Sequence, residues 1–368
     1  MTHIPLVDLQ AQHSEIAAEV ERGFARVFQT AAFVLGPAVA EFEDAFARFS
    51  GVRHCIGVAN GTDALELALR AIGVDRDDEV ILPANSFIAT ALAVMRAGAR
   101  PVLVDVDPEY HLIDGKQVER ALRPRTRAVI PVHLYGQMAA MESLQTLAAS
   151  AGVALIEDAA QAQGAARNGR GSGSFGIAAG TSFYPGKNLG AYGDGGAVLT
   201  NSDDVASTVR ALRNYGSEVK YHHPAPGFNS RLDTLQAVVL RAKLDRLAAW
   251  NEARRAAARR YDALLADIPG VRRPTVAPGN VHIWHLYVVR VPRRDAVLAA
   301  LNAAGIGAGI HYPLPMHLQG ALHRLGYGPG DFPITEEAAA TVLSLPLFPH
   351  ITPAQQERVA DALRQALS

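Results

Sequence analysis

Short apolar runs alternate with helix-like segments over residues 54–200, and this alternation constrains the fold more than any other feature. The runs carry few polar positions, which is typical of strands buried on both faces. Strands of this kind separated by helices predict a mostly parallel sheet covered on both sides. The expected strands are His54–Val58, Glu79–Pro83, Pro101–Val106, Ala128–Val132, Val153–Glu157, Gly180–Tyr184 and Gly196–Thr200, and the expected helices between them are Thr62–Ile72, Ser86–Ala97, Gln117–Leu122 and Met138–Ala149.

The flanking segments predict further helices and a second, smaller unit. Apolar residues at helical spacing indicate helices over residues 9–28, 39–49 and 231–265. A cluster of prolines and glycines at residues 269–279 indicates a boundary, and beyond it we expect a strand at His285–Val291 and helices at Asp295–Ala304 and Pro353–Leu367. We therefore predict a large α/β domain, residues 1–250, and a small α/β C-terminal domain, residues 251–368.

The balance of charges excludes several classes of protein. The 35 Lys and Arg residues and the 36 Asp and Glu residues give a formal net charge of −1. A chain this close to neutral has no overall field to attract nucleic acid or an anionic membrane. The solvated face of one helix is expected to carry Arg254, Arg255, Arg259 and Arg260.

Cysteine and histidine usage bears on metal sites and on the compartment. Cys55 is the single cysteine, which excludes a disulfide framework and a Cys-rich zinc site. The thirteen histidines show no zinc-binding spacing, so no metal is expected. Neither a signal peptide nor a run near the ~20 apolar residues of a membrane span is evident. We expect a cytoplasmic protein with no membrane association.

Only four lysines occur among the 35 basic residues, so any chemistry that needs a primary amine has four side-chain candidates. Lys187 follows an expected core strand within a loop rich in proline and glycine. Lys116, Lys220 and Lys243 lie in segments expected to be solvated. A partly buried lysine can lose its proton and form a Schiff base with a carbonyl group. Lys187 is therefore the candidate for such chemistry.

Other candidate residues follow the expected strands, where open α/β sheets bind ligands. Gly61 and Thr62 open a helix whose free N–H groups suit a phosphate, although a plain N-cap gives the same pattern. Asp158 could cap a turn or face a buried cation. Three further candidates are Phe87, as a stacking ring or a core residue, Gln161, as an amide donor, and Ser182, as a phosphate ligand.

These groups together match the needs of pyridoxal 5′-phosphate. The cofactor requires an amine for its aldehyde, an acid to keep its ring nitrogen protonated, and donors for its phosphate. The segment Gly171–Gly176 matches the glycine spacing of dinucleotide-binding loops. However, no apolar strand precedes it and no helix follows it, so we reject a nicotinamide site there.

Several longer motifs resemble the DegT/DnrJ/StrS sugar aminotransferases, a family of fold-type I pyridoxal-phosphate enzymes. The similarity runs essentially from end to end, and motifs of this kind in this order are highly specific. They are Ile4–Leu9, Asn60–Leu65, Ile156–Gln161, Ser182–Gly190, Gly193–Ala197, Phe228–Leu232 and His311–Pro313. The resemblance implies the fold-type I aminotransferase fold, which has a large domain with a mixed, mostly parallel sheet covered by helices and a small α/β C-terminal domain.

The resemblance also implies roles for individual residues around the cofactor ring. Lys187 would form the Schiff base and move the proton during transamination, and Asp158 would pair with the ring nitrogen. Gln161 would hydrogen-bond the ring hydroxyl, and Phe87 would stack on the ring.

The phosphate of the cofactor is the second group for which the resemblance implies ligands. Gly61, Thr62 and Ser182 would bind it from one subunit. Asn229 would reach it from the second subunit, as in similar enzymes. The resemblance thus implies a homodimer with shared active sites.

The implied reaction is transamination of a dTDP-linked 3-keto-6-deoxyhexose by L-glutamate, which yields a 3-amino-3,6-dideoxyhexose nucleotide and 2-oxoglutarate. Tyr184 stands where other branches of the family often have histidine, and with Tyr312 and His317 it is a candidate for the sugar pocket. Amination at C4 of a dTDP- or UDP-linked 4-keto sugar is the main alternative. A sugar dehydratase, in which histidine replaces Lys187, and a noncatalytic regulatory protein are further alternatives.

Overall fold

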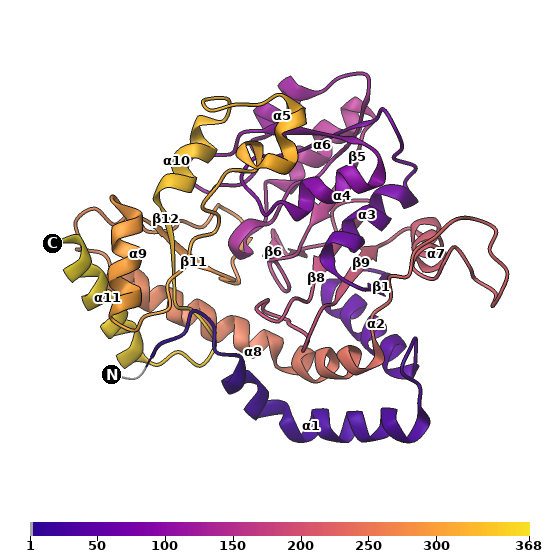
Figure 1. Cartoon of the computed structure of the whole chain (residues 1–368), viewed down its shortest axis with the longest axis horizontal. Helices are drawn as coiled ribbons and strands as arrows, with labels where there is room; N and C mark the ends of the chain where they lie inside the picture. Colours follow the sequence, from indigo (N-terminus) through magenta and orange to yellow (C-terminus); the bar gives the residue numbers. More distant parts are fainter. Residues whose placement is uncertain (1–2) are drawn as a thin grey trace.

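A seven-stranded sheet organises residues 54–200 in the computed structural model, which describes residues 3–368 (Figure 1). Its order is β1-β9-β8-β5-β4-β2-β3. Every neighbouring pair is parallel except those of β9, which runs antiparallel to β1 and to β8. The bounds are β1 His54–Val58, β2 Glu79–Pro83, β3 Arg100–Val104, β4 Thr126–Val129, β5 Ala154–Asp158, β8 Ala178–Ser182 and β9 Gly196–Thr200. This mixed, mostly parallel sheet confirms the predicted fold class.

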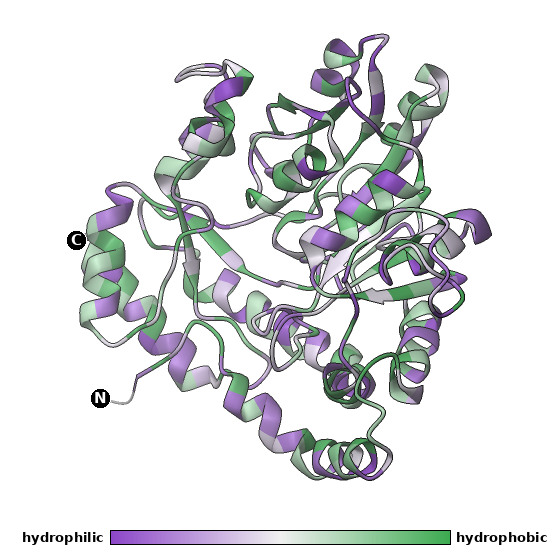
Figure 2. Ribbon diagram, turned by 45° about the vertical axis from the view of Figure 1, so that its right-hand side comes forward, coloured by the Kyte–Doolittle hydropathy of each residue, from purple (hydrophilic) through white to green (hydrophobic). Residues whose placement is uncertain are grey.

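Helices cover both faces of the sheet because the buried strand residues alternate between two cores. Val80 and Leu82 of β2 enter one core, whereas Ile81 enters the other. The first face is covered by α3 Gly61–Ala71, α4 Ala89–Ala97 and α7 Asp203–Leu212. The second is covered by α2 Pro37–Ser50, α5 Gly115–Ala121, α6 Met141–Ala151 and part of α8 Thr234–Leu264. Figure 2 shows hydrophilic and hydrophobic residues alternating along the surface helices.

A smaller antiparallel sheet lies in the C-terminal part of the chain. It pairs β11 Tyr287–Arg290 with β12 Val342–Leu345. A separate core joins it to α9 Arg294–Ala303, α11 Pro353–Leu367 and the C-terminal half of α8. The predicted domain boundary after residue 250 falls within α8, whose Leu247 packs in one core and Ala257 in the next. The division into two domains stays a prediction.

The remaining elements frame these two sheets. The N-terminal helix, α1 Leu9–Thr30, packs along α8. Three short strands form a separate sheet, and further short helices connect the larger ones. These elements are β6 Ala166–Arg167, β7 Arg170–Gly171, β10 Asn280–Val281, α10 Pro333–Thr341, η1 Leu134–Gly136, η2 Met316–Leu318 and η3 Gly320–Leu325. No helix within residues 3–368 combines the length and the apolar character needed to cross a membrane.

The expected positions of β4 and β8 and the expected exposure of one arginine need correction. Strand β4, Thr126–Val129, begins two residues and ends three residues before the expected Ala128–Val132. Strand β8 lies two residues before its expected position, because its sequence of small residues, Ala-Ala-Gly-Thr-Ser, lacks the bulky apolar pattern used to locate it. Arg254 is fully buried rather than solvated. Its guanidinium donates hydrogen bonds to the carbonyls of Leu347 at 2.9 Å and Trp284 at 3.3 Å, which replace water as its partners.

The contact between α3 and β8 requires glycine at position 180. A Cβ atom at Gly180 would lie 2.8 Å from Leu65 Cδ2 and 3.1 Å from the Leu65 backbone nitrogen. We expect Gly180→Ala to force the helix away from the strand and to destabilise the protein by about 1–3 kcal/mol. Urea unfolding measures this loss.

The matched control is Gly115→Ala at the first residue of α5. A Cβ there would have Leu144 Cδ2 as its nearest neighbour, at 4.0 Å. This variant should unfold at the wild-type urea concentration or slightly above it, since alanine restricts the unfolded chain. Equal unfolding midpoints for the two variants would contradict the close packing at Gly180.

Candidate active site

A cavity of about 600 Å³ opens at the carboxyl ends of β1, β2, β5 and β8. This is the edge of the sheet where loops enter helices and where α/β folds bind ligands. Nine of the predicted site residues line it: Gly61, Thr62, Phe87, Asp158, Gln161, Ser182, Tyr184, Lys187 and Tyr312.

Asp158 is a buried carboxylate at the end of β5. Its Oδ2 atom accepts a hydrogen bond from Thr90 Oγ1 at 2.7 Å, and its Oδ1 atom accepts one from the Ala160 backbone N–H at 3.1 Å. Burial raises the pKa of Asp158, although these hydrogen bonds and the charge of Lys187 oppose the change. Asp158 does cap the turn through the Ala160 N–H, but this role alone does not describe it, because Asp158 also lines the cavity together with Lys187.

Lys187 lies in the loop that follows β8. Its backbone N–H donates to the Tyr184 carbonyl at 2.8 Å, which forms a tight turn. Desolvation lowers the pKa of Lys187 to about 8, and the Asp158 carboxylate opposes this change. Near neutral pH the amine can therefore lose its proton far more readily than a solvated lysine.

Two buried polar residues hold the loop after Lys187. Asn188 Nδ2 donates to Asn251 Oδ1 at 2.8 Å and to the Ile283 carbonyl at 3.1 Å. Lys243 Nζ donates to the Gly190 carbonyl at 2.7 Å. The expectation that Lys243 is solvated is wrong, since Lys243 is only 1% exposed. Burial lowers the pKa of its amine to about 8. It lies outside the cavity, whereas Lys116 and Lys220 are exposed as expected.

The beginning of α3 forms a candidate phosphate cradle. Asn60 caps the helix through its Oδ1 atom, which accepts a hydrogen bond from the Asp63 N–H at 2.8 Å. A Cβ atom at Gly61 would lie 2.6 Å from Ser182 Cβ, so glycine is needed for the helix to approach β8. This close approach brings the free N–H groups of α3 together with the hydroxyls of Thr62 and Ser182.

Aromatic and amide side chains form another wall of the cavity. Phe87 is 54% exposed and lines the cavity, so it is not a core residue. Its ring centroid lies 5.5 Å from that of Tyr312. Gln161 Nε2 donates to Tyr312 Oη at 3.1 Å, and its Oε1 accepts from the Tyr135 N–H at 2.6 Å. These bonds fix the orientation of the Gln161 amide.

Sequence reasoning missed two histidines and a threonine in this cavity. Burial and the charge of Lys187 lower the pKa of His311 to about 4. They also lower the pKa of His285 well below its ordinary value, so both imidazoles are neutral. Histidine spacing indicates only that a zinc site is absent and carries no signal for this role, although His311 belongs to the motif His311–Pro313. Thr90 stands in the first turn of the helix that follows Phe87, and its position there was the available signal.

Two predicted site residues lie outside the cavity. His317 is buried, its Nε2–H donates to Glu336 Oε1 at 3.0 Å, and its ring packs edge-on against Phe332. Packing against the neighbouring α10 segment holds it away from the cavity, and its assignment to the sugar pocket stays a prediction. Asn229 is exposed and pairs through its backbone with Asn214. Its contact with a second subunit stays a prediction.

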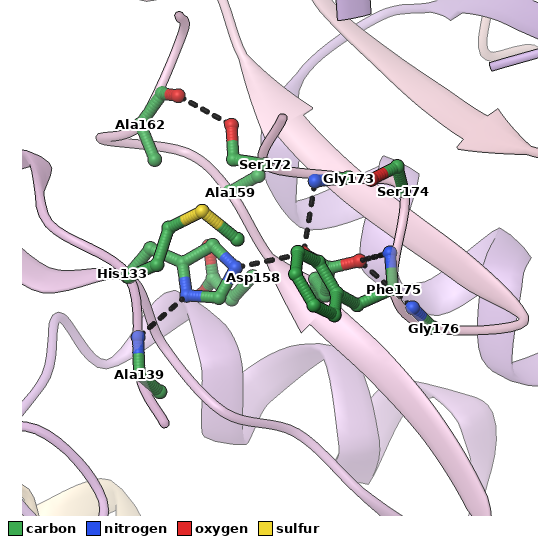
Figure 3. A network of polar contacts seen from close by, with 12 residues as sticks. His133, Ala139, Asp158, Ala159, Ala162, Ser172, Gly173, Ser174, Phe175 and Gly176 are labelled. Carbon is green, nitrogen blue, oxygen red and sulfur yellow. Dashed lines mark hydrogen bonds and ion pairs between the residues drawn. The ribbon is translucent and has the colours of Figure 1, made fainter. Parts of the chain in front are cut away.

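Alternation along β5 sends Glu157 to the side opposite Asp158, and Glu157 is fully buried. Figure 3 shows His133 and residues 173–176, which surround its carboxylate. Its Oε1 atom accepts hydrogen bonds from the N–H groups of Phe175 at 2.7 Å and Gly176 at 2.8 Å. Its Oε2 atom accepts from the Gly173 N–H at 2.9 Å and from His133 Nε2 at 2.8 Å. The glycine-rich segment rejected as a dinucleotide site thus binds a carboxylate of the chain itself.

The residues that line the cavity fit the pyridoxal phosphate predicted from the sequence. Lys187 supplies an amine with a lowered pKa, and Asp158 supplies a buried acid. The cradle around Gly61 has no room for a side chain but presents backbone and hydroxyl donors. The arrangement can therefore hold an aldehyde, a basic ring nitrogen and a phosphate within one cavity.

Comparison with known proteins gives consistent results. Residues 14–364 match the DegT/DnrJ/EryC1/StrS aminotransferase family. The dTDP-3-amino-3,4,6-trideoxy-alpha-D-glucose transaminase of Streptomyces venezuelae is 46% identical over 98% of this chain and 96% of its own. A pleiotropic regulatory protein of Geobacillus stearothermophilus is 45% identical over 99% of this chain and 98% of its own.

Solved structures agree with the sequence comparison. The crystal structure of S. venezuelae DesV in complex with a ketimine intermediate superposes with a TM-score of 0.97. It is 46% identical in sequence, and the match covers 99% of this chain and 98% of DesV.

The Glu157 carboxylate with its four hydrogen-bond donors, here called the Glu157 clamp, predicts a large effect for a small substitution. We expect Glu157→Gln to destabilise the protein by at least about 2 kcal/mol, because the amide –NH₂ would face backbone N–H donors and leave one without an acceptor. Chemical denaturation near pH 7 measures the loss, and Glu119→Gln on the exposed face of α5 is the matched control.

The same clamp sets a pH dependence. Hydrogen bonds from His133 and from the Gly173 and Gly176 N–H groups lower the pKa of Glu157, against the opposing effect of burial. This stability is present above the ordinary glutamate pKa of about 4.3 and is lost as the pH falls through the lower folded value. The stability difference between wild type and Glu157→Gln should therefore shrink at acid pH. A difference that stays constant from pH 7 to pH 3 would contradict the clamp.

Proposed function

The chain belongs to the DegT/DnrJ/EryC1/StrS aminotransferase family, whose cofactor is pyridoxal 5′-phosphate, and from this membership we propose its reaction. It transfers the amino group of L-glutamate to a dTDP-linked 3-keto-6-deoxyhexose. The products are a 3-amino-3,6-dideoxyhexose nucleotide and 2-oxoglutarate. The observation that carries the proposal is that Lys187 and Asp158 line one cavity, close enough for their charges to interact, together with a phosphate cradle.

Lys187 is the proposed catalytic base and acid. When bound, the cofactor supplies an aldehyde that accepts the amino group and a ring that takes up electrons. With its pKa lowered to about 8, the Lys187 amine can take a proton from the substrate carbon and return it later. The lowered pKa values of His285 and His311 make their imidazoles weaker bases than the Lys187 amine.

Asp158 is proposed to keep a proton on the ring nitrogen of the cofactor. A buried carboxylate stabilises an adjacent cation strongly, since little water competes with it. The hydrogen bonds from Thr90 and Ala160 hold its two oxygens in a fixed orientation. We propose that Gln161 and Phe87 orient the ring from the neighbouring wall.

The proposed phosphate ligands are the α3 N-terminus at Gly61 and the hydroxyls of Thr62 and Ser182. Tyr184 and Tyr312 are proposed for the sugar, since Tyr184 is 61% exposed at the cavity wall and Tyr312 lies beside Phe87. The relatedness to a dTDP-3-amino-sugar transaminase supports amination at C3 over C4.

We propose that the active enzyme is a homodimer with shared sites. A group of large apolar side chains near Asn229 is exposed on the single chain, which is uncommon for a monomer. It consists of Phe33, Val34, Tyr215, Val219 and Tyr221. A second copy covering this surface would bring Asn229 to its partner's phosphate. The cytoplasmic location stays a prediction.

A noncatalytic regulatory role is the second candidate, because the relative from G. stearothermophilus is named as a regulatory protein. The retention of both Lys187 and Asp158, with the amine pKa lowered, favours catalysis. Lys187 also argues against the dehydratase alternative.

The proposed reaction is tested with L-glutamate and a panel of dTDP- and UDP-linked 3-keto and 4-keto sugars. We expect a 3-amino sugar product from a dTDP-linked 3-keto substrate, identified by NMR. Lys187→Ala should reduce the rate at least about 10³-fold, because both proton transfers lose their carrier.

Lys116→Ala is the control for this experiment, since it removes an exposed lysine from α5. It should retain wild-type activity. A 4-amino product would overturn the choice of carbon. Wild-type rates in Lys187→Ala would overturn the catalytic assignment.

The shared site is tested by mixing two impaired variants, Lys187→Ala and Asn229→Asp. If Asn229 acts across the interface, a mixed dimer contains one site with both residues intact, and activity should rise well above that of either variant alone. If Asn229 acts within its own subunit, no site in the mixed dimer is intact. Mass spectrometry verifies that mixed dimers form, and their failure to gain activity would contradict the shared arrangement.

A further inference from the structure

A second, small cavity lies apart from the active site and is rich in basic groups. It has a volume of about 30 Å³, enough for a water molecule or the end of a small polar ligand. The segments that form it are residues 109–111, residues 272–275 and β11. Leu286 lines both cavities, but none of the proposed catalytic or cofactor-binding residues lines the small one.

Arg272 and Arg290 stand directly opposite each other on paired backbone segments at this cavity. Each backbone N–H donates to the other residue's carbonyl at 2.9 Å. Residues paired in this way place their side chains on the same side of the ribbon, about 5 Å apart at Cβ. Like charges directly opposite each other are destabilising, so the arrangement needs an explanation.

His111 adds a third polar group whose hydrogen bonding is incomplete. The residue is 8% exposed and lines the same cavity, and its Nδ1 atom is buried without a hydrogen-bond partner. Its backbone adopts a left-handed conformation, with φ 57°, that non-glycine residues rarely use. Burial, Arg290 and Arg272 lower the pKa of His111 to about 4.

The acidic groups nearby leave this basic cluster only partly compensated. Glu109 lines the cavity but forms no ion pair there. Glu337 is largely exposed, and its Oε1 atom lies 3.8 Å from Arg290 Nη1. Arg273 donates to the Asp262 carbonyl, whereas the Arg272 guanidinium has no partner within residues 3–368. Arg272 is solvent-exposed, and its positive charge lacks a counter-ion among residues 3–368.

We propose that this cavity is a binding site for an oxyanion, a carboxylate or phosphate group held between Arg272 and Arg290. Each guanidinium carries a planar fork of N–H donors that binds such oxygens. An anion would replace the repulsion between the arginines with two attractions. His111, whose buried Nδ1 atom lacks a hydrogen-bond partner, forms part of the wall beside it. This inference does not depend on the proposed sugar substrate.

Isothermal titration calorimetry of the cofactor-saturated enzyme tests the site. Potassium phosphate and sodium succinate serve as separate probes, at constant ionic strength, so the two arms distinguish phosphate from carboxylate. We expect saturable binding of at least one probe. Arg272→Gln and Arg290→Gln should each weaken that binding at least tenfold.

Arg76→Gln is the matched control, because it removes one exposed arginine that does not line the cavity. It should bind the probe as the wild type does. Without any probe, Arg272→Gln should melt at a higher temperature than the wild type, since the repulsion is relieved. The absence of saturable binding, or binding that Arg272→Gln leaves unchanged, would overturn the proposal.

Discussion

Two consecutive carboxylates at the end of β5 must both be satisfied inside the protein, and the candidate site is built around this requirement. Alternation along the strand sends Glu157 and Asp158 to opposite faces of the sheet. Glu157 is satisfied by three backbone N–H groups and His133 (Figure 3). Asp158 is satisfied by Thr90 and Ala160 and faces Lys187. Each carboxylate therefore ties a different segment to the strand end, Glu157 the loop at residues 173–176 and Asp158 the helix α4, because an unpaired buried charge would be too costly.

Buried basic groups hold the other side of the site through backbone carbonyls. Lys243 binds the carbonyl of Gly190, in the loop after Lys187, and Arg254 binds that of Trp284, next to His285. Neither forms an ion pair with a carboxylate in the described part of the chain. Burial and the charges of Lys187 and Arg254 together lower the pKa of His285. The site is thus held in place before any ligand binds, which is what efficient proton transfer requires.

The sequence predicted the bounds of strands accurately where the side chains are bulky and buried on both faces of the sheet. Strands β1, β2 and β9 have the predicted bounds. The predicted position of β8 was two residues too late in the sequence, because the small side chains of this strand carry no periodic signal. Strands β6, β7 and β10, of two residues each, are too short for any periodicity. Reading the strand ends brought seven predicted residues to one cavity, and the family resemblance added Tyr184 and Tyr312. The resemblance also suggested His317, which is buried outside the cavity.

The sequence by itself determined the order of strands and helices, the family motifs and the choice of Lys187 among four lysines. These follow from local pattern, which each residue carries with its neighbours. Only the tertiary structure decided that Lys243 and Arg254 are buried, that Glu157 binds residues 173–176, and that Arg272 opposes Arg290. Burial and charge pairing depend on contacts between segments far apart in the chain, and no local pattern encodes which distant partner a charged side chain will meet.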